Sequence, residues 1–182
     1  MKLKTYRFNR IKNTNDKAIQ IIKKDNIKNG IIIANFQTKG KGQYGRSWIS
    51  FKGNLFVTVF LCIQNTKFSI LNFTKFNCKI VKNILSNYTK DKITIKPPND
   101  ILIKNKKICG ILQERMSIND NEFILIGIGI NLIKSPIIKK YPTTNLYELT
   151  KKKININRFY KDIKLSYELF LDKLLKLNKK FY

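Results

Sequence analysis

Three glycines punctuate a strongly basic segment near the middle of the N-terminal half of the chain, in the string GKGQYGRSW. Gly40, Gly42 and Gly45 would let the backbone approach a ligand closely and turn its N–H groups toward an anion. Lys41 and Arg46 add fixed positive charge to the same loop. These residue types in this order favour a site for an anionic ligand over a flexible surface loop.

The same segment formally matches the pattern G-x-G-x-x-G, but its surroundings do not fit a dinucleotide-binding fold. That fold needs a helix after the third glycine and an acidic residue about 20 positions later. Here Trp48 and β-branched residues follow, and no acidic residue occurs between Asp25 and Asp91. The chain also lacks the H-R-D and D-F-G strings of kinases and the G-K-[ST] of a Walker loop. We therefore expect an anion site of another kind.

Composition limits the catalytic chemistry further. The 182 residues include 37 Lys and Arg, 11 Asp and Glu and no histidine, which gives a net charge of +26. The absence of histidine excludes a Ser-His-Asp or Cys-His triad and a histidine-ligated metal. Catalysis must therefore rest on lysine, arginine, amides and backbone donors. Because 43% of the residues are hydrophobic, a folded core is expected despite the charge.

The basic excess is spread along the chain. Only five of the 37 basic residues are arginine, and lysine, asparagine and isoleucine, all abundant here, share A/T-rich codons. A solvated lysine-rich surface explains this distribution better than a dedicated nucleic-acid face. Three separated cysteines predict buried, reduced thiols and a cytoplasmic location. No signal peptide and no membrane-spanning segment are expected, since the longest apolar runs are far too short.

The elements that must position these residues can be placed from apolar periodicity and turn signals. The pattern predicts one α+β domain over residues 1–182, with a mixed, mostly antiparallel sheet and helices packed on it. The basic glycine segment falls in a loop between two strands. Helices are predicted over residues 14–26, 70–88, 144–149 and 158–177, and strands over residues 30–36, 54–63, 92–96, 101–103, 108–115 and 123–129.

Three further motifs follow the glycine loop in a fixed order: KPPND over residues 96–100, KICGILQE over residues 107–114 and GIGINL over residues 127–132. Together with the loop, this ordered set resembles the catalytic domain of biotin protein ligases. The resemblance spans roughly residues 8–177. Any one of the motifs is weak, whereas all four in register are specific.

The resemblance implies particular roles. Lys96 would contact the biotin carboxylate and the reacting phosphate, with Lys41 and Arg46 as the other catalytic cations. Residues expected to bind ATP are Arg46, Trp48, Asn99 and Asn131, and no side chain is expected to ligate a metal. Residues expected to bind biotin are Asn13, Thr14, Asn15, Gln37, Gly40, Lys41, Gly42, Gln43, Lys96, Gly110, Gly127 and Gly129.

The implied activity is a two-step ligation. With ATP and Mg²⁺, biotin would become biotinyl-5'-adenylate, and a lysine of the biotin carboxyl carrier domain of acetyl-CoA carboxylase would then accept the biotin. One alternative is a lipoate or octanoyl-type acyl ligase or transferase of the same fold, for which Cys109 is the only candidate nucleophile. The other alternative is a basic nucleic-acid-binding or structural relic of a ligase.

The sequence departs from the family pattern at several places. Gln43 stands where an arginine is usual, so we expect faster leakage of the adenylate, and Pro97 replaces a tryptophan. Asn13 replaces a serine, which conserves hydrogen bonding.

Neither an N-terminal DNA-binding domain nor the small C-terminal β-barrel is expected, so specific DNA is not an expected partner. A homodimer contact could take over part of the barrel's role.

Overall fold

A single mixed sheet organises the computed structural model, which describes residues 2–63 and 70–178. Only the first pair of strands in its order is parallel, and every other neighbouring pair is antiparallel. The α+β prediction with a mostly antiparallel sheet is therefore confirmed. From edge to edge the strands are β1 (Lys4–Phe8), β2 (Asn29–Ala34), β5 (Leu55–Cys62), β9 (Asn121–Ile130), β8 (Lys106–Ile118), β7 (Asp100–Ile103) and β6 (Ile93–Lys96).

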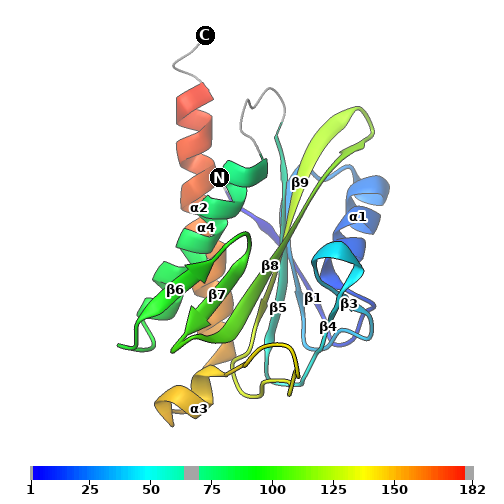
Figure 1. Cartoon of the computed structure of the whole chain (residues 1–182). Helices are drawn as coiled ribbons and strands as arrows, with labels where there is room; N and C mark the ends of the chain where they lie inside the picture. The colour runs from blue at the N-terminus through cyan, green and yellow to red at the C-terminus, as the bar shows by residue number, and fades with distance from the viewer. Residues whose placement is uncertain (1, 64–69, 179–182) are drawn as a thin grey trace.

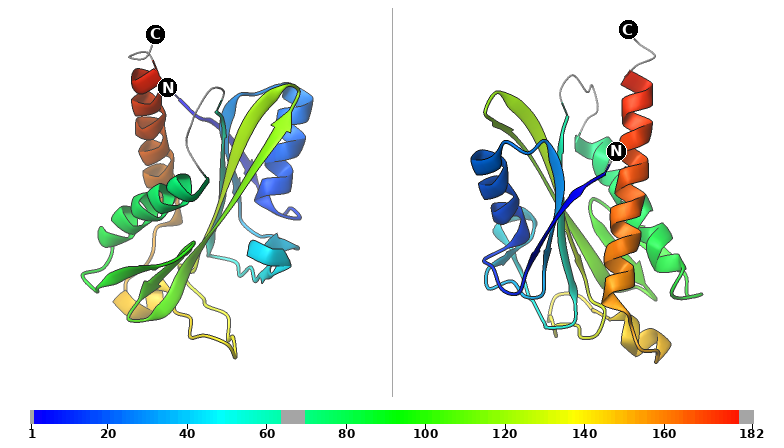
Figure 2. Two further views of the ribbon diagram at one scale, coloured as in Figure 1. Left: turned by 45° about the horizontal axis from the view of Figure 1, so that its top comes forward. Right: turned by 180° about the vertical axis from the view of Figure 1, so that it is seen from behind.

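Helices cover both faces of this sheet (Figure 1). Helix α1 (Thr14–Asp25) lies on one face, while α2 (Ile70–Ser86) and α4 (Ile156–Asn178) lie on the other, as both views of Figure 2 show. The short helix α3 (Leu146–Thr150) precedes α4. No helix in the described ranges is long and apolar enough to cross a membrane.

The predicted elements are all present, with boundaries that differ by a few residues. Strand β1 is an addition that the periodicity did not predict. Its sequence KTYRF alternates exposed and half-buried residues at the sheet edge, so it lacks the β-branched run that marks a central strand. The hairpin of β8 and β9 is longer than predicted, because both strands continue well beyond their apolar stretches.

Two apolar clusters fill the two layers. The larger one lies between the sheet and helices α2 and α4, and contains every second residue of β9, namely Ile124, Ile126, Ile128 and Ile130. The smaller one joins Ala18 and Ile22 of α1 to the opposite side of the sheet. Cys78 and Cys109 are buried as predicted, but Cys62 is partly exposed because it ends β5 on the thinner α1 side.

The glycine segment is more ordered than the predicted loop. It forms the short strands β3 (Gly40–Lys41) and β4 (Ser47–Trp48), joined by a single 3₁₀ turn. Tyr44 and Gly45 in this turn both have positive φ, of 55° and 71°. A glycine suits the second of these positions, because other residues adopt that conformation only at a cost. The ribbon thus folds back on itself above the α1 face of the sheet (Figure 1).

Candidate ligand-binding site

A small cavity of about 80 Å³ lies between the glycine segment, the start of α1 and the α1 face of β8 and β9. Most of the residues that the sequence predicted to bind ligands surround it, although they come from five separate stretches of the chain. The predicted residues on its wall are Asn13, Thr14, Asn15, Gln37, Lys41, Gly42, Gln43, Arg46, Trp48, Asn99, Gly110, Gly127 and Gly129.

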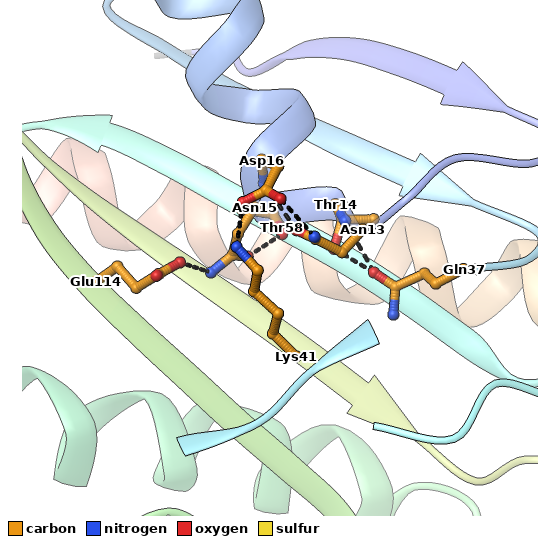
Figure 3. A network of polar contacts seen from close by, with 8 residues as sticks. All are labelled: Asn13, Thr14, Asn15, Asp16, Gln37, Lys41, Thr58 and Glu114. Carbon is orange, nitrogen blue, oxygen red and sulfur yellow. Dashed lines mark hydrogen bonds and ion pairs between the residues drawn. The ribbon is translucent and has the colours of Figure 1, made fainter. Parts of the chain in front are cut away.

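The first turn of α1 presents two buried polar side chains to this cavity. Asn13 caps the helix, since its Oδ1 accepts a hydrogen bond of 2.8 Å from the backbone N–H of Asp16. The backbone N–H and the hydroxyl of Thr14 both donate to Oε1 of Gln37, at 2.8 and 3.1 Å (Figure 3). Gln37 is therefore fixed by its oxygen, which leaves its NH₂ group as a donor at the cavity wall.

Asn15 is held on the sheet by both ends of its amide. Its Oδ1 accepts from the hydroxyl of Thr58 at 2.5 Å, and its Nδ2 donates to Oε2 of Glu114 at 2.6 Å (Figure 3). A Cβ atom on Gly127 would lie 2.6 Å from Asn15 Oδ1. A glycine is therefore needed beneath this amide, and the contact ties α1 to β5, β8 and β9.

Lys41 links the glycine segment to the same helix turn. Its Nζ lies 2.6 Å from Oδ1 of Asp16, whose Oδ2 also accepts a hydrogen bond from Asn13 (Figure 3). Burial acts to raise the pKa of Asp16, but the hydrogen bonds from Lys41 and Asn13 outweigh it and bring that pKa below its ordinary value of 3.8. Asp16 therefore remains ionised near neutral pH and holds Lys41 over the cavity.

Trp48 lies against Gly110 and Gly129, which face each other across β8 and β9 and which we call the glycine floor. A Cβ atom would lie 2.8 Å from the indole ring at Gly110 and 2.5 Å from it at Gly129. The indole Nε1 is buried and has no hydrogen-bond partner in the described part of the chain. The ring therefore occupies the space that two missing side chains leave, and this is why the remaining cavity is small.

The structure brings a different lysine to the cavity from the one expected. Lys107, at the start of β8, lies on the wall with its Nζ 2.8 Å from Oδ1 of Asp100 and 5.6 Å from the Trp48 ring. Lys96 is exposed at the end of the outermost strand β6 and is not among the residues that line the cavity. Lys96 nevertheless stands in a cross-strand row with Asp100, Gly110 and Gly129, on the same face of the sheet as the cavity.

Two other expected residues also lie outside the wall. Gly40 is buried opposite Trp48 in the β3–β4 ladder, where a Cβ would meet the Trp48 carbonyl oxygen at 2.5 Å. Asn131 is 1% exposed and donates from Nδ2 to the Thr144 carbonyl at 3.2 Å. Residues on the wall that the sequence reasoning did not assign to the site include Ser47, Asp100, Lys107, Ile111, Leu112, Ile128 and Tyr141.

Cys109 points away from the site into the larger core. It is fully buried, and this burial raises the pKa of its thiol well above the ordinary value. A protonated thiol in the core cannot act as the nucleophile that an octanoyl-type transferase would need. No group of three or more Cys, Asp or Glu side chains in the described ranges is arranged to hold a metal ion.

The sequence matches the Biotin/lipoate A/B protein ligase family over residues 7–131, and the chain belongs to that family.

Relatives and solved structures within the family agree. The bifunctional ligase/repressor BirA of Escherichia coli is 27% identical over 146 residues, which cover 76% of this chain and 46% of that protein. The biotin--[acetyl-CoA-carboxylase] ligase of Paracoccus denitrificans is 30% identical over 108 residues, or 58% of this chain and 45% of that one. The chain thus spans about half the length of these relatives.

The biotin protein ligase of Aquifex aeolicus, solved in complex with biotin and ATP, superposes with a TM-score of 0.78 and 26% identity over 93% of this chain and 71% of that chain. The fold is therefore shared along nearly the whole chain.

Proposed function

We propose that this chain activates biotin with ATP and transfers it to a lysine of a biotin carboxyl carrier domain of acetyl-CoA carboxylase. The observation that carries the proposal is the glycine floor of β8 and β9, enclosed by buried amides on one side and by cations on the other. Relatives named as biotin ligases, and a similar structure holding biotin and ATP, support the same activity.

The first step joins two anions, so its main demand is charge neutralisation and alignment. A biotin carboxylate oxygen attacks the α-phosphorus of ATP, a new P–O bond forms, and pyrophosphate leaves with the electrons of the broken P–O bond. Lys107, Lys41 and Arg46 stand around the cavity and would offset the developing charge. In this proposal Lys107 supplies charge from the wall, while Lys96 keeps its expected role because it stands in the same cross-strand row as Asp100, Gly110 and Gly129.

The second step releases AMP. The amine of the acceptor lysine, in its unprotonated form, attacks the acyl carbon of biotinyl-5'-adenylate, and an amide bond replaces the acyl phosphate bond. No nucleophile on the chain is needed, in agreement with the buried, inward-facing thiol of Cys109.

The two ends of the cavity suit the two halves of the adenylate. The amides of Asn13 and Gln37 and the hydroxyl of Thr14 offer directional partners for the ureido ring of biotin. At the other end, Trp48 lies on Gly110 and Gly129, so the ring must leave this floor when ligand enters. An adenine placed there would then stack against the indole that it displaced.

The remaining expectations belong to the same proposal. Mg²⁺ would arrive bound to the ATP phosphates, since Asp100 on the cavity wall is already ion-paired with Lys107. A cytoplasmic location is part of the proposal. The proposed partners do not include specific DNA, and a homodimer is a proposal that light scattering would check. Lipoate or octanoyl chemistry is not favoured, because the named relatives and the complexed structures are biotin enzymes.

The decisive experiment measures pyrophosphate release that depends on both biotin and ATP. Lys107→Ala should lower the rate by about 10³-fold, the usual cost of removing a group that stabilises transition-state charge. Lys96→Ala is measured beside it, because Lys96 stands in the same cross-strand row as Gly110 and Gly129 although it does not line the cavity. Release that does not require biotin would contradict the function, whereas collapse in Lys96→Ala alone would contradict only the role given to Lys107.

A further inference from the structure

Two chain segments lie side by side at the mouth of the cavity. The backbone N–H of Thr38 donates to the Ile11 carbonyl at 2.9 Å, and that of Lys39 donates to the Lys12 carbonyl at 2.8 Å. These segments lead directly into Asn13 and out of Gln37, which both line the cavity. They carry Arg10, Lys12 and Lys39, which we call the basic lip.

The positive charge of the basic lip is uncompensated. All three side chains are exposed, and none of them has an ion pair with a carboxylate of the described residues. The nearest acidic group on this side, Asp16, is already bonded to Lys41, and Lys12 adds to the positive field that it experiences. The acid-free stretch between Asp25 and Asp91 leaves the neighbouring segments without counter-charge.

The small substrates do not account for this charge. Arg10, Lys12 and Lys39 do not line the cavity, while three other cations already do. Arg10 instead rests over the ring of Phe36, with its guanidinium carbon 5.1 Å from the ring centroid. The basic lip therefore faces outward, toward whatever approaches the mouth.

The charge of an approaching acceptor then decides whether it can dock. A lysine that arrives here is itself cationic before it loses its proton, and the lip would repel it if it came with a neutral or basic surface. Carboxylates beside that lysine would reverse the sign of the interaction and steer the domain into place.

We infer that the basic lip is the docking surface for an acidic protein domain that presents the acceptor lysine. The inference rests on the proposed function and adds to it where the acceptor binds and what its surface must carry. Since the lip lies outside the cavity, it acts on transfer and not on adenylate formation.

The test compares two double charge reversals. Lys12→Glu/Lys39→Glu alters the lip, and Lys23→Glu/Lys24→Glu makes the same charge change at the far end of α1. Transfer to a biotin carboxyl carrier domain with acidic residues beside its lysine is measured below saturation and at low salt. The lip variant should transfer at least about tenfold more slowly than the control, as expected for lost electrostatic steering, and the gap should close in high salt.

Matched readouts separate this inference from the proposed function. Pyrophosphate release should be the same in both double variants, and a carrier domain whose flanking acids are changed to amides should react equally with both. Direct titration of the carrier domain onto the chain tests the lip even where no adenylate forms. Equal transfer and equal carrier affinity in the two variants would overturn the inference. Loss of binding to a short single-stranded RNA alone, with carrier transfer unchanged, would also overturn it and assign the lip to nucleic acid.

Discussion

The two faces of the β8–β9 hairpin carry different side chains beside the cavity. On the α1 side the strands carry Gly110, Gly127 and Gly129, which leave room for Asn15 and the Trp48 ring. On the side of α2 and α4, the intervening residues are buried aliphatic side chains such as Ile111 and Ile126. Because successive strand residues point to opposite faces, neighbouring residues of one strand belong alternately to the ligand floor and to the core.

This division teaches how a small sheet can hold a ligand site without losing its core. Glycines weaken a strand, since they bury no side chain and are conformationally free. Here the larger apolar cluster on the reverse face supplies the packing that the floor lacks. Stability and ligand binding should therefore respond to different residues of the same two strands.

The largest expected effect is on the core face. Ile126→Ala removes a fully buried side chain from the cluster beneath α2 and α4, so unfolding free energy should fall by about 2–5 kcal/mol. Urea titration measures this loss. Biotin affinity, corrected for the folded fraction, should stay close to that of the unaltered chain, and a large loss of intrinsic affinity would break the proposed separation of the two faces.

The floor should show the reverse behaviour. In Gly129→Ala the new methyl group would stand where the Trp48 ring now lies, and the ring, which belongs to the short two-stranded β3–β4 ribbon, can move aside. Stability should change little, whereas biotin-dependent pyrophosphate release should fall by about 100-fold, because a displacement of the order of 1 Å at a reacting site has that cost. A variant that lost stability but kept its rate would contradict this.

A smaller effect is expected in the glycine loop above the floor. Gln43 lines the cavity but cannot offer a charged fork to phosphate. Gln43→Arg should slow the dissociation of biotinyl-5'-adenylate about tenfold, in keeping with the ~1.5 kcal/mol of one charge-assisted hydrogen bond. Chase experiments with unlabelled biotin and ATP measure this rate, and Gln43→Lys serves as a control for charge alone. An unchanged rate in Gln43→Arg would show that this position does not retain the adenylate.

The smallest effect concerns the contact between Asp16 and Lys41. The folded pKa of Asp16 is below its ordinary value of 3.8, so its contribution to stability is present above 3.8 and is lost as pH falls through the lower folded value. Asp16→Asn should cost less than about 1 kcal/mol near neutral pH, because the pair is partly exposed. The difference in unfolding free energy between Asp16→Asn and the unaltered chain should vanish in acid. A difference that grew in acid would contradict the lowered pKa of Asp16.

The sequence predicted the fold class from local patterns, and the resemblance to biotin protein ligases supplied most of the residues of the cavity wall. Runs of isoleucine marked the buried strands, and the glycine and asparagine motifs marked positions where side chains are small or polar. The presence of Lys107 on the wall depended on something else. Only the folded chain brings this lysine beside Asp100 and the Trp48 ring.

Side-chain contacts between segments far apart in the chain could not be predicted from the sequence pattern. The pair of Lys41 and Asp16 joins residues 25 positions apart through side chains that each look like ordinary surface charge in sequence. The position of Trp48 on Gly110 and Gly129 likewise depends on how the β3–β4 ribbon folds over the sheet. The edge strand β1 was missed because an exposed edge does not require an apolar run.

The position of Trp48 on the glycine floor also means that its fluorescence should report ligand binding. Trp48 is the only tryptophan in the sequence, so the intrinsic indole emission of the whole protein comes from this one ring. Its Nε1 is buried without a hydrogen-bond partner in the described part of the chain, and the Lys107 ammonium lies 5.6 Å from the ring centroid. Filling of the floor would change both surroundings at once, so the emission spectrum should follow ligand entry without any label.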